Sequence, residues 1–283
     1  IVLLHGFFGA LSNFQGLIAY FRLHNRVIVP ILPLLDMDIL HTSVGGLAKY
    51  VNRFLEILDL KEVHLLGNSL GGHVALVHVL KNPARVRSLI LTGSSGLFEN
   101  GMGDSYPRRG DYEYIKNKTA LTFYDPAIAT KELVDEVYSI TNNRLKVIKI
   151  IALAKSAIRN NLGEELNQIK LPTLLIWGNN DTITPPFVGQ EFNKLIPNSE
   201  LHFIDKCGHA PMMEVPDEFN KILGMMEKLN ELDTENVEPL THVLPLQNVF
   251  REDIMKESFP REAILKNAPN ANEEFFKVPK VIG

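Results

Sequence analysis

The stretch Gly67-Asn68-Ser69-Leu70-Gly71-Gly72 decides the fold expected of this 283-residue chain. It lies between an apolar run ending at Leu66, typical of a buried strand, and a helical pattern starting at Leu70. The letters alone arise often by chance, but a G-x-S-x-G between a strand and a helix is a nucleophile elbow. Bulky side chains at Gly67 or Gly71 would collide with the neighbouring strand and helix. We therefore predict that Ser69 is a nucleophile.

Around this elbow, short apolar runs alternate with longer amphipathic stretches, which predicts an α/β fold with a mostly parallel sheet. Strands are expected at Ile1–Leu4, Arg26–Pro30, Val63–Leu66, Ser88–Thr92, Thr173–Trp177 and Glu200–Ile204. Helices are expected at Ser12–Phe21, Ser43–Leu58, Leu70–Leu80, Pro186–Leu195 and Pro216–Leu229.

Two regions break the alternation of strands and helices. Residues 94–170 open with Gly, Tyr, Arg and Asp and continue with helical patterns at Lys131–Ser139 and Leu145–Ile158, as an inserted segment would. Residues 233–283 are interrupted by Pro239, Pro245, Pro260, Pro269 and Pro279, leaving room for one short helix near Val249–Lys256. We expect a core formed by residues 1–93 and 171–232, an inserted helical segment at 94–170 and a proline-rich C-terminal tail.

A histidine and an aspartate lie where a serine nucleophile needs its partners. His209 follows the last predicted strand, in a loop at the carboxyl end of the sheet, where α/β proteins bind ligands. Asp181 lies in the strand-to-helix loop after Trp177, where it could orient an imidazole or cap a helix. His73 is an alternative base, although a role in packing is favoured over a role as base. Asp205 is an alternative acid, although it ends a strand and suits a turn.

The loop His5-Gly6-Phe7-Phe8-Gly9 follows the first predicted strand and can direct a backbone N–H at a developing oxyanion. We predict an oxyanion hole formed by the N–H groups of Phe7 and Leu70, with Phe8 as the alternative to Phe7. His5 is expected to bond loop backbone.

The segments HGFFG, GNSLGG, WGNND and CGHAPMMEVPDEFN, in this order, resemble the α/β-hydrolase superfamily. They are most similar to its branch of meta-cleavage-product carbon–carbon hydrolases and related small esterases. The resemblance runs from Ile1 to about Leu229, keeps the family order of serine, acid and histidine, and implies that residues 94–170 are a cap that selects the substrate.

The chain departs from that branch in three places. Val137 stands where the carbon–carbon hydrolases carry a cap arginine that grips the substrate's acid group, although Arg144 or Arg159 could replace it. The usual pair of strands before the first motif is missing, so the sequence looks truncated at its N-terminus. The proline-rich tail is not part of the family pattern.

These residues predict a serine hydrolase that cleaves a small, partly apolar carboxylic ester through Ser69, His209 and Asp181 and an acyl-enzyme. The alternatives are a carbon–carbon bond hydrolase of meta-cleavage products, a lyase, or a ligand receptor on the same fold. The candidate substrate-binding residues, of which the aromatic ones could equally be packing residues, are Phe8, Asn68, Tyr106, Tyr112, Phe123 and Arg159.

Composition and charge argue against several other classes of protein. A net charge of −4 without a dense Lys/Arg stripe argues against nucleic-acid binding. The single cysteine, Cys207, excludes an intramolecular disulfide and suits a cytoplasmic protein. No apolar run reaches the ~20 residues of a membrane span, and no cofactor or metal motif is present. We therefore expect a small-molecule substrate, no cofactor, no metal and no membrane partner.

Overall fold

A computed structural model describes residues 1–9, 11–100, 108, 110–230, 259–268, 270 and 272–276. The chain divides into two units, Ile1–Asp233 and Thr234–Gly283, which are described separately. The first unit contains the predicted elbow, His209 and Asp181.

The sheet of the first unit has five parallel strands in sequence order: β1 (Val2–Leu4), β2 (Val63–Asn68), β3 (Val86–Thr92), β4 (Thr173–Gly178) and β5 (Ser199–Ile204). These are five of the six predicted strands. The sixth prediction, Arg26–Pro30, is wrong, because this segment contributes only one bridge, between Val2 and Ile28. The Leu3 N–H donates to the Ile28 carbonyl at 2.9 Å. The next donor would come from Pro30, which has no N–H.

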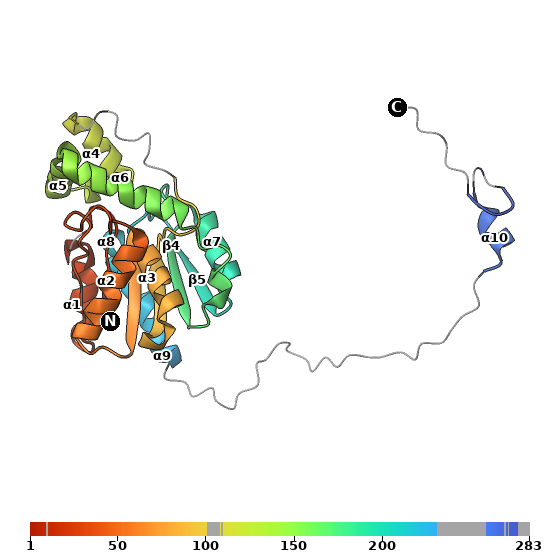
Figure 1. Ribbon diagram of the computed structural model, residues 1–283, viewed down its shortest axis with the longest axis horizontal. Helices are drawn as coiled ribbons and strands as arrows, with labels where there is room; N and C mark the ends of the chain where they lie inside the picture. The colour runs from red at the N-terminus through yellow and green to blue at the C-terminus, as the bar shows by residue number, and fades with distance from the viewer. Residues whose placement is uncertain are drawn as a thin grey trace. The chain divides into compact units, whose positions relative to one another are not determined.

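Successive strand residues point to opposite faces of the sheet and so enter two apolar clusters. Helices α2 (Val44–Ile57), α3 (Leu70–Lys81) and α7 (Pro186–Leu195) cover one face (Figure 1). Helices α1 (Gln15–Phe21), α8 (Pro211–Glu214) and α9 (Pro216–Asn230) cover the other. Short 3₁₀ helices lie at Leu11–Phe14, Pro83–Arg85, Pro126–Ile128 and Leu166–Gln168.

Three helices lie between β3 and β4: α4 (Tyr112–Ala120), α5 (Lys131–Asn142) and α6 (Arg144–Arg159). They form a separate group beside the α/β layers in Figure 1. Sequence periodicity predicted α5 and α6 but missed α4, whose composition is polar. Its start is fixed instead by Asp111, whose side chain accepts a hydrogen bond from the Tyr114 N–H.

Within the second unit, the structure describes one short helix, α10 (Arg261–Leu265), directly after Pro260. Proline suits the start of a helix, where its missing N–H is not needed. The helix expected near Val249–Lys256 lies outside the described residues.

Candidate active site

The turn from β2 into α3 holds Ser69 in a strained conformation. Its φ of 52° and ψ of −123° lie in a region that non-glycine residues rarely occupy. A Cβ added to Gly71 would lie 2.1 Å from the Leu4 carbonyl oxygen, and one added to Gly67 would lie 2.5 Å from the Gly71 oxygen. The close approach of strand and helix therefore requires both glycines, as the sequence motif predicts.

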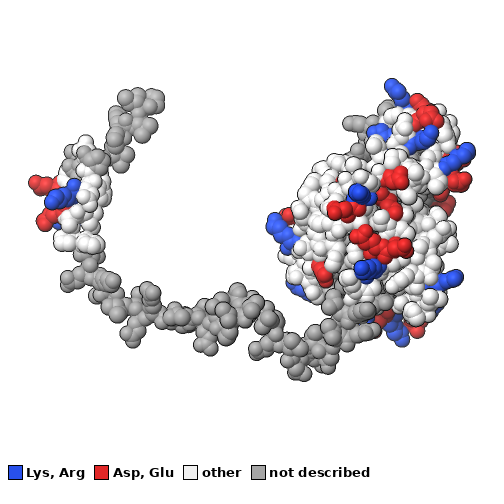
Figure 2. Space-filling model, turned by 180° about the vertical axis from the view of Figure 1, so that it is seen from behind, with Lys and Arg blue, Asp and Glu red and all other residues white. Residues whose placement is uncertain are grey.

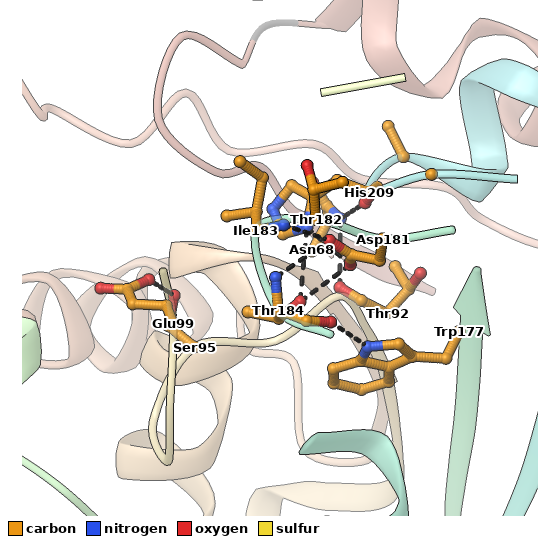
Figure 3. A network of polar contacts seen from close by, with 12 residues as sticks. Asn68, Thr92, Ser95, Glu99, Trp177, Asp181, Thr182, Ile183, Thr184 and His209 are labelled. Carbon is orange, nitrogen blue, oxygen red and sulfur yellow. Dashed lines mark hydrogen bonds and ion pairs between the residues drawn. The ribbon is translucent and has the colours of Figure 1, made fainter. Parts of the chain in front are cut away.

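The structure brings Asp181 and His209 together, although they come from different loops (Figure 3). His209 Nδ1 lies 2.8 Å from Asp181 Oδ2, and both side chains are buried. Asp181 Oδ1 accepts hydrogen bonds from the N–H groups of Ile183 and Thr184, at 2.8 and 2.9 Å. The alternative acid, Asp205, is exposed and accepts a hydrogen bond from the Asn179 amide.

The surroundings of His209 favour its charged form. Burial lowers the pKa of the imidazole, but the carboxylates around it together outweigh this effect, Asp181 most through its charge and its hydrogen bond, so the pKa lies above its usual 6.5. The carboxylates of Glu99 and Glu214 also raise this pKa. His209 Nε2, the atom free to exchange a proton with a substrate or a hydroxyl, is buried without a hydrogen-bond partner among the described residues.

The loop after β1 passes directly against Ser69. A Cβ on Gly6 would lie 2.9 Å from Ser69 Cβ, so only glycine allows this approach. Phe7 and Phe8 follow in the same loop, and Leu70 begins α3, where a first-turn N–H has no acceptor within its own helix. The predicted structural role of His5 is confirmed: its Nδ1 lies 3.0 Å from the Gly6 carbonyl, and its Nε2 accepts the Leu32 N–H at 3.0 Å.

Two residues that sequence reasoning missed hold Asp181 and the loop of His209 in place. The Thr184 hydroxyl donates to Asp181 Oδ2 at 2.8 Å. The Glu214 carboxylate accepts hydrogen bonds from the N–H groups of Gly208 and Ala210, at 3.0 and 3.3 Å, on either side of His209. It also accepts the Tyr124 N–H at 2.7 Å and so joins the inserted segment to the histidine loop. Glu214 lies only five residues after His209, but nothing in the local sequence distinguishes it from a carboxylate that faces solvent.

The predicted substrate-binding residues fall in several different places. The Asn68 amide donates to the carbonyls of Thr92 and His209, at 3.0 and 3.1 Å, so it ties the elbow to the histidine loop. Phe123 is buried in the apolar cluster beneath that loop, and its neighbour Thr122 accepts the His209 N–H at 2.9 Å. The Tyr112 hydroxyl donates to Asp135 at 2.7 Å, a contact within the inserted segment.

The remaining candidates do not gather around Ser69. Arg159 is exposed and lines a hollow that includes none of Ser69, Asp181 and His209. Tyr106 lies outside the described residues. His73, the alternative base, is buried in α3 and donates from Nε2 to the Asn160 carbonyl at 2.9 Å. Burial lowers its pKa to about 4, so it packs as a neutral imidazole.

Within the described part of the chain, no three His, Cys, Asp or Glu side chains are placed to hold a metal ion. Of the helices described, none is long and apolar enough to cross a membrane. Acidic and basic side chains are both scattered over the face of the first unit in Figure 2, and no broad basic field is visible on that face.

Comparison with known proteins assigns the fold. A family profile described as the alpha/beta hydrolase fold matches residues 1–127 and 139–216. The solved structure of MGS-MChE2, an alpha/beta hydrolase enzyme from the metagenome of lagoon sediments at Mar Chica, Morocco, is 43% identical. That match covers 82% of this chain and 91% of the other, with a TM-score of 0.68.

A curated relative comes from the predicted branch. The 2-hydroxy-6-oxononadienedioate/2-hydroxy-6-oxononatrienedioate hydrolase 1 of Dechloromonas aromatica is 29% identical over 62% of this chain. The chain spans 65% of the length of that relative. The resemblance to meta-cleavage-product hydrolases is thereby confirmed.

A different family matches the C-terminal part. The profile of the Glu-tRNAGln amidotransferase C subunit matches residues 212–278. The C subunit of the aspartyl/glutamyl-tRNA(Asn/Gln) amidotransferase of Caldanaerobacter subterraneus is 49% identical over 31% of this chain and 97% of its own length. The chain therefore belongs to the α/β-hydrolase family, and its C-terminal part belongs to the family of the amidotransferase C subunit. From composition alone, residues 233–283 are predicted only to be a proline-rich tail.

Proposed function

We propose that the first unit is a serine hydrolase in which Ser69 attacks the substrate, His209 acts as general base and Asp181 orients the histidine. The observation that carries this proposal is the 2.8 Å contact between His209 and Asp181 beside the strained Ser69 turn. A carboxylate at Nδ1 fixes the tautomer, leaving Nε2 to take the serine proton and return it to the leaving group.

The oxyanion that forms on attack needs donors that are already in place. We propose the N–H groups of Phe7 and Leu70 for this role, with Phe8 as the alternative to Phe7. Support comes from the close approach of the Gly6 backbone to Ser69 and from the position of Leu70 at the start of α3.

The names of the relatives make a carbon–carbon bond of a meta-cleavage product the first candidate substrate, ahead of the ester expected from sequence. The Dechloromonas hydrolase is named for 2-hydroxy-6-oxononadienedioate, a dicarboxylate. In that reaction the same three residues would begin with a proton transfer before the bond is cleaved.

The charges around His209 favour the second candidate, a neutral carboxylic ester. Glu99 accepts a hydrogen bond from Ser95 at 2.7 Å, and its charge acts on His209. Val137 is buried, and Arg144 is exposed at the start of α6. Among these cap positions none supplies a cation next to His209, and a substrate carboxylate held there without a partner would be costly to desolvate.

One comparison of substrates separates the two candidates. We expect a higher kcat/KM for a meta-cleavage dienoate than for a neutral aryl ester. At a pH where His209 is neutral in both proteins, Glu99→Gln should then raise kcat/KM for the dienoate by about threefold, because it removes one repulsive charge, and leave the ester rate unchanged. Turnover of the ester with no detectable turnover of the dienoate would exclude the first candidate and support the ester. An exposed acid, Asp217→Asn, is the control.

For the C-terminal part we propose association with the other subunits of an amidotransferase, as the printed name of the Caldanaerobacter relative suggests. Support comes from 49% identity over almost the whole length of that relative. Co-expression of the full chain with those subunits, followed by affinity capture, tests the proposal. Capture of the subunits is expected, and their absence from the captured material would contradict it.

A further inference from the structure

A hollow of about 630 Å³ opens where the inserted helices meet the core, away from the candidate active site. Its walls come from α6 of the insertion, from α3 and the start of α2, and from the segment after α6. None of Ser69, Asp181 and His209 lines it. Its size falls within the range of small-molecule sites, about 300–1,000 Å³.

Three basic side chains converge on this hollow. Lys155 and Arg159 come from one face of α6, and Lys81 ends α3, against a single lining carboxylate, Glu165. In the described part of the chain none of the three cations has an ion pair within 4.0 Å. Lys155 and Arg159 are four residues apart on a helix, where like charges repel. An anion bound between them would relieve that repulsion.

The lining of the hollow is mixed, with a few apolar side chains among polar ones such as Thr42, Ser43 and Gln168. Val77 and Leu162 are buried, at 4% and 1% exposure, and Leu80 is half-buried beside them. At the start of α2, a Cβ added to Gly45 would meet nothing within 4 Å, so this wall leaves open space for a ligand. The combination of a mixed lining with basic groups suits a ligand that has an anionic head and a small apolar body.

We propose that this hollow binds a small organic anion, with its phosphate or carboxylate head between Lys81, Lys155 and Arg159 and its small apolar body against Leu80. The hollow spans the insertion and the core, which already meet there through the hydrogen bond from the Val44 N–H to Ser156 Oγ at 3.1 Å. A ligand in this position would contact both.

Isothermal titration of the full chain at constant ionic strength tests the proposal, with phenyl phosphate, inorganic phosphate and hexanoate as probes. We expect saturable binding of phenyl phosphate or hexanoate, and weaker binding of inorganic phosphate, which lacks an apolar body. The result for the two organic probes tells a phosphate head from a carboxylate head. The double variant Lys155→Ala/Arg159→Ala should lower the affinity at least about tenfold.

Arg144→Ala, an exposed arginine on the same helix outside the hollow, is the matched control and should bind as the unmodified chain does. Circular dichroism of each variant checks that it is folded. Absence of saturable binding up to about 10 mM of every probe would overturn the proposal. So would an affinity that the folded double variant leaves unchanged.

Discussion

At the scale of single residues, replacing Asp181 with asparagine would disrupt the hydrogen bonds that its side chain accepts. Its two oxygens accept four hydrogen bonds, from two backbone N–H groups, the Thr184 hydroxyl and His209 Nδ1. An asparagine NH₂ in either position would face donors instead of acceptors. The environment therefore demands a carboxylate, in contrast to Asp205, which is exposed to solvent.

The same contacts predict how activity depends on pH. His209 must be neutral to act as base, and Asp181 together with Glu99 and Glu214 holds its pKa above 6.5 against the effect of burial, so the acid limb of kcat/KM should have its midpoint above 6.5. Asp181→Asn should lower the His209 pKa in an NMR titration, because burial then acts without the opposing carboxylate. It should also reduce kcat by on the order of 10⁴, as in the best-studied triad. A larger loss from Asp205→Asn would show that the acid is misassigned.

Glu214 acts on His209 through the backbone and is a positioning residue. Glu214→Ala removes the acceptor for the N–H groups on both sides of His209, so we expect kcat to fall by about 10–100-fold while KM changes little. Glu214→Gln keeps an oxygen acceptor and should recover part of the rate. Equal losses in the exposed control Glu218→Ala would contradict the assignment.

At the scale of elements, the sequence predicted those whose signals are local. The residues Pro186–Leu195 were predicted to be a helix with the observed bounds, because Pro186 suits the first turn and its apolar residues have helical spacing. The short helix α8 and the polar helix α4 have no such pattern and were missed. The pairing of Asp181 with His209 could be predicted, because both residues lie in loops that follow strands at the carboxyl end of the sheet. Thr184 and Glu214 lie within six residues of their partners, but nothing in the local sequence shows that their side chains turn back onto the loop. The contacts of Asn68 with His209 and of Tyr124 with Glu214 join distant segments and depend on tertiary packing, which one sequence does not reveal.

Helix α9 sets the position at which the chain can be shortened. Phe219, Ile222 and Leu223 on this helix are buried in the hydrolase core, each contributing about 1.5–3 kcal/mol by burial. A chain that ends at Asn230 should keep its thermal transition and its hydrolase activity. A chain that ends at Val215 should lose both, since the sum approaches the whole stability of a typical domain. Loss of folding in the longer version would show that residues beyond α9 complete the core.

At the scale of the whole molecule, two families meet within one short stretch. The hydrolase profile ends at residue 216, and the profile of the amidotransferase family begins at residue 212. Residues of α9 therefore fall within the amidotransferase match while their apolar side chains are buried in the hydrolase core. A partner that needs this apolar face would have to compete with the hydrolase for it.

The proposal that Ser69 is a nucleophile activated by His209 can be tested by labelling the full chain with a fluorophosphonate probe, followed by intact-mass analysis and peptide mapping. We expect one adduct per chain, located on Ser69. It should be absent in Ser69→Ala and form much more slowly in His209→Ala. No adduct on a folded, unmodified chain, or an adduct that persists in Ser69→Ala, would contradict the proposal.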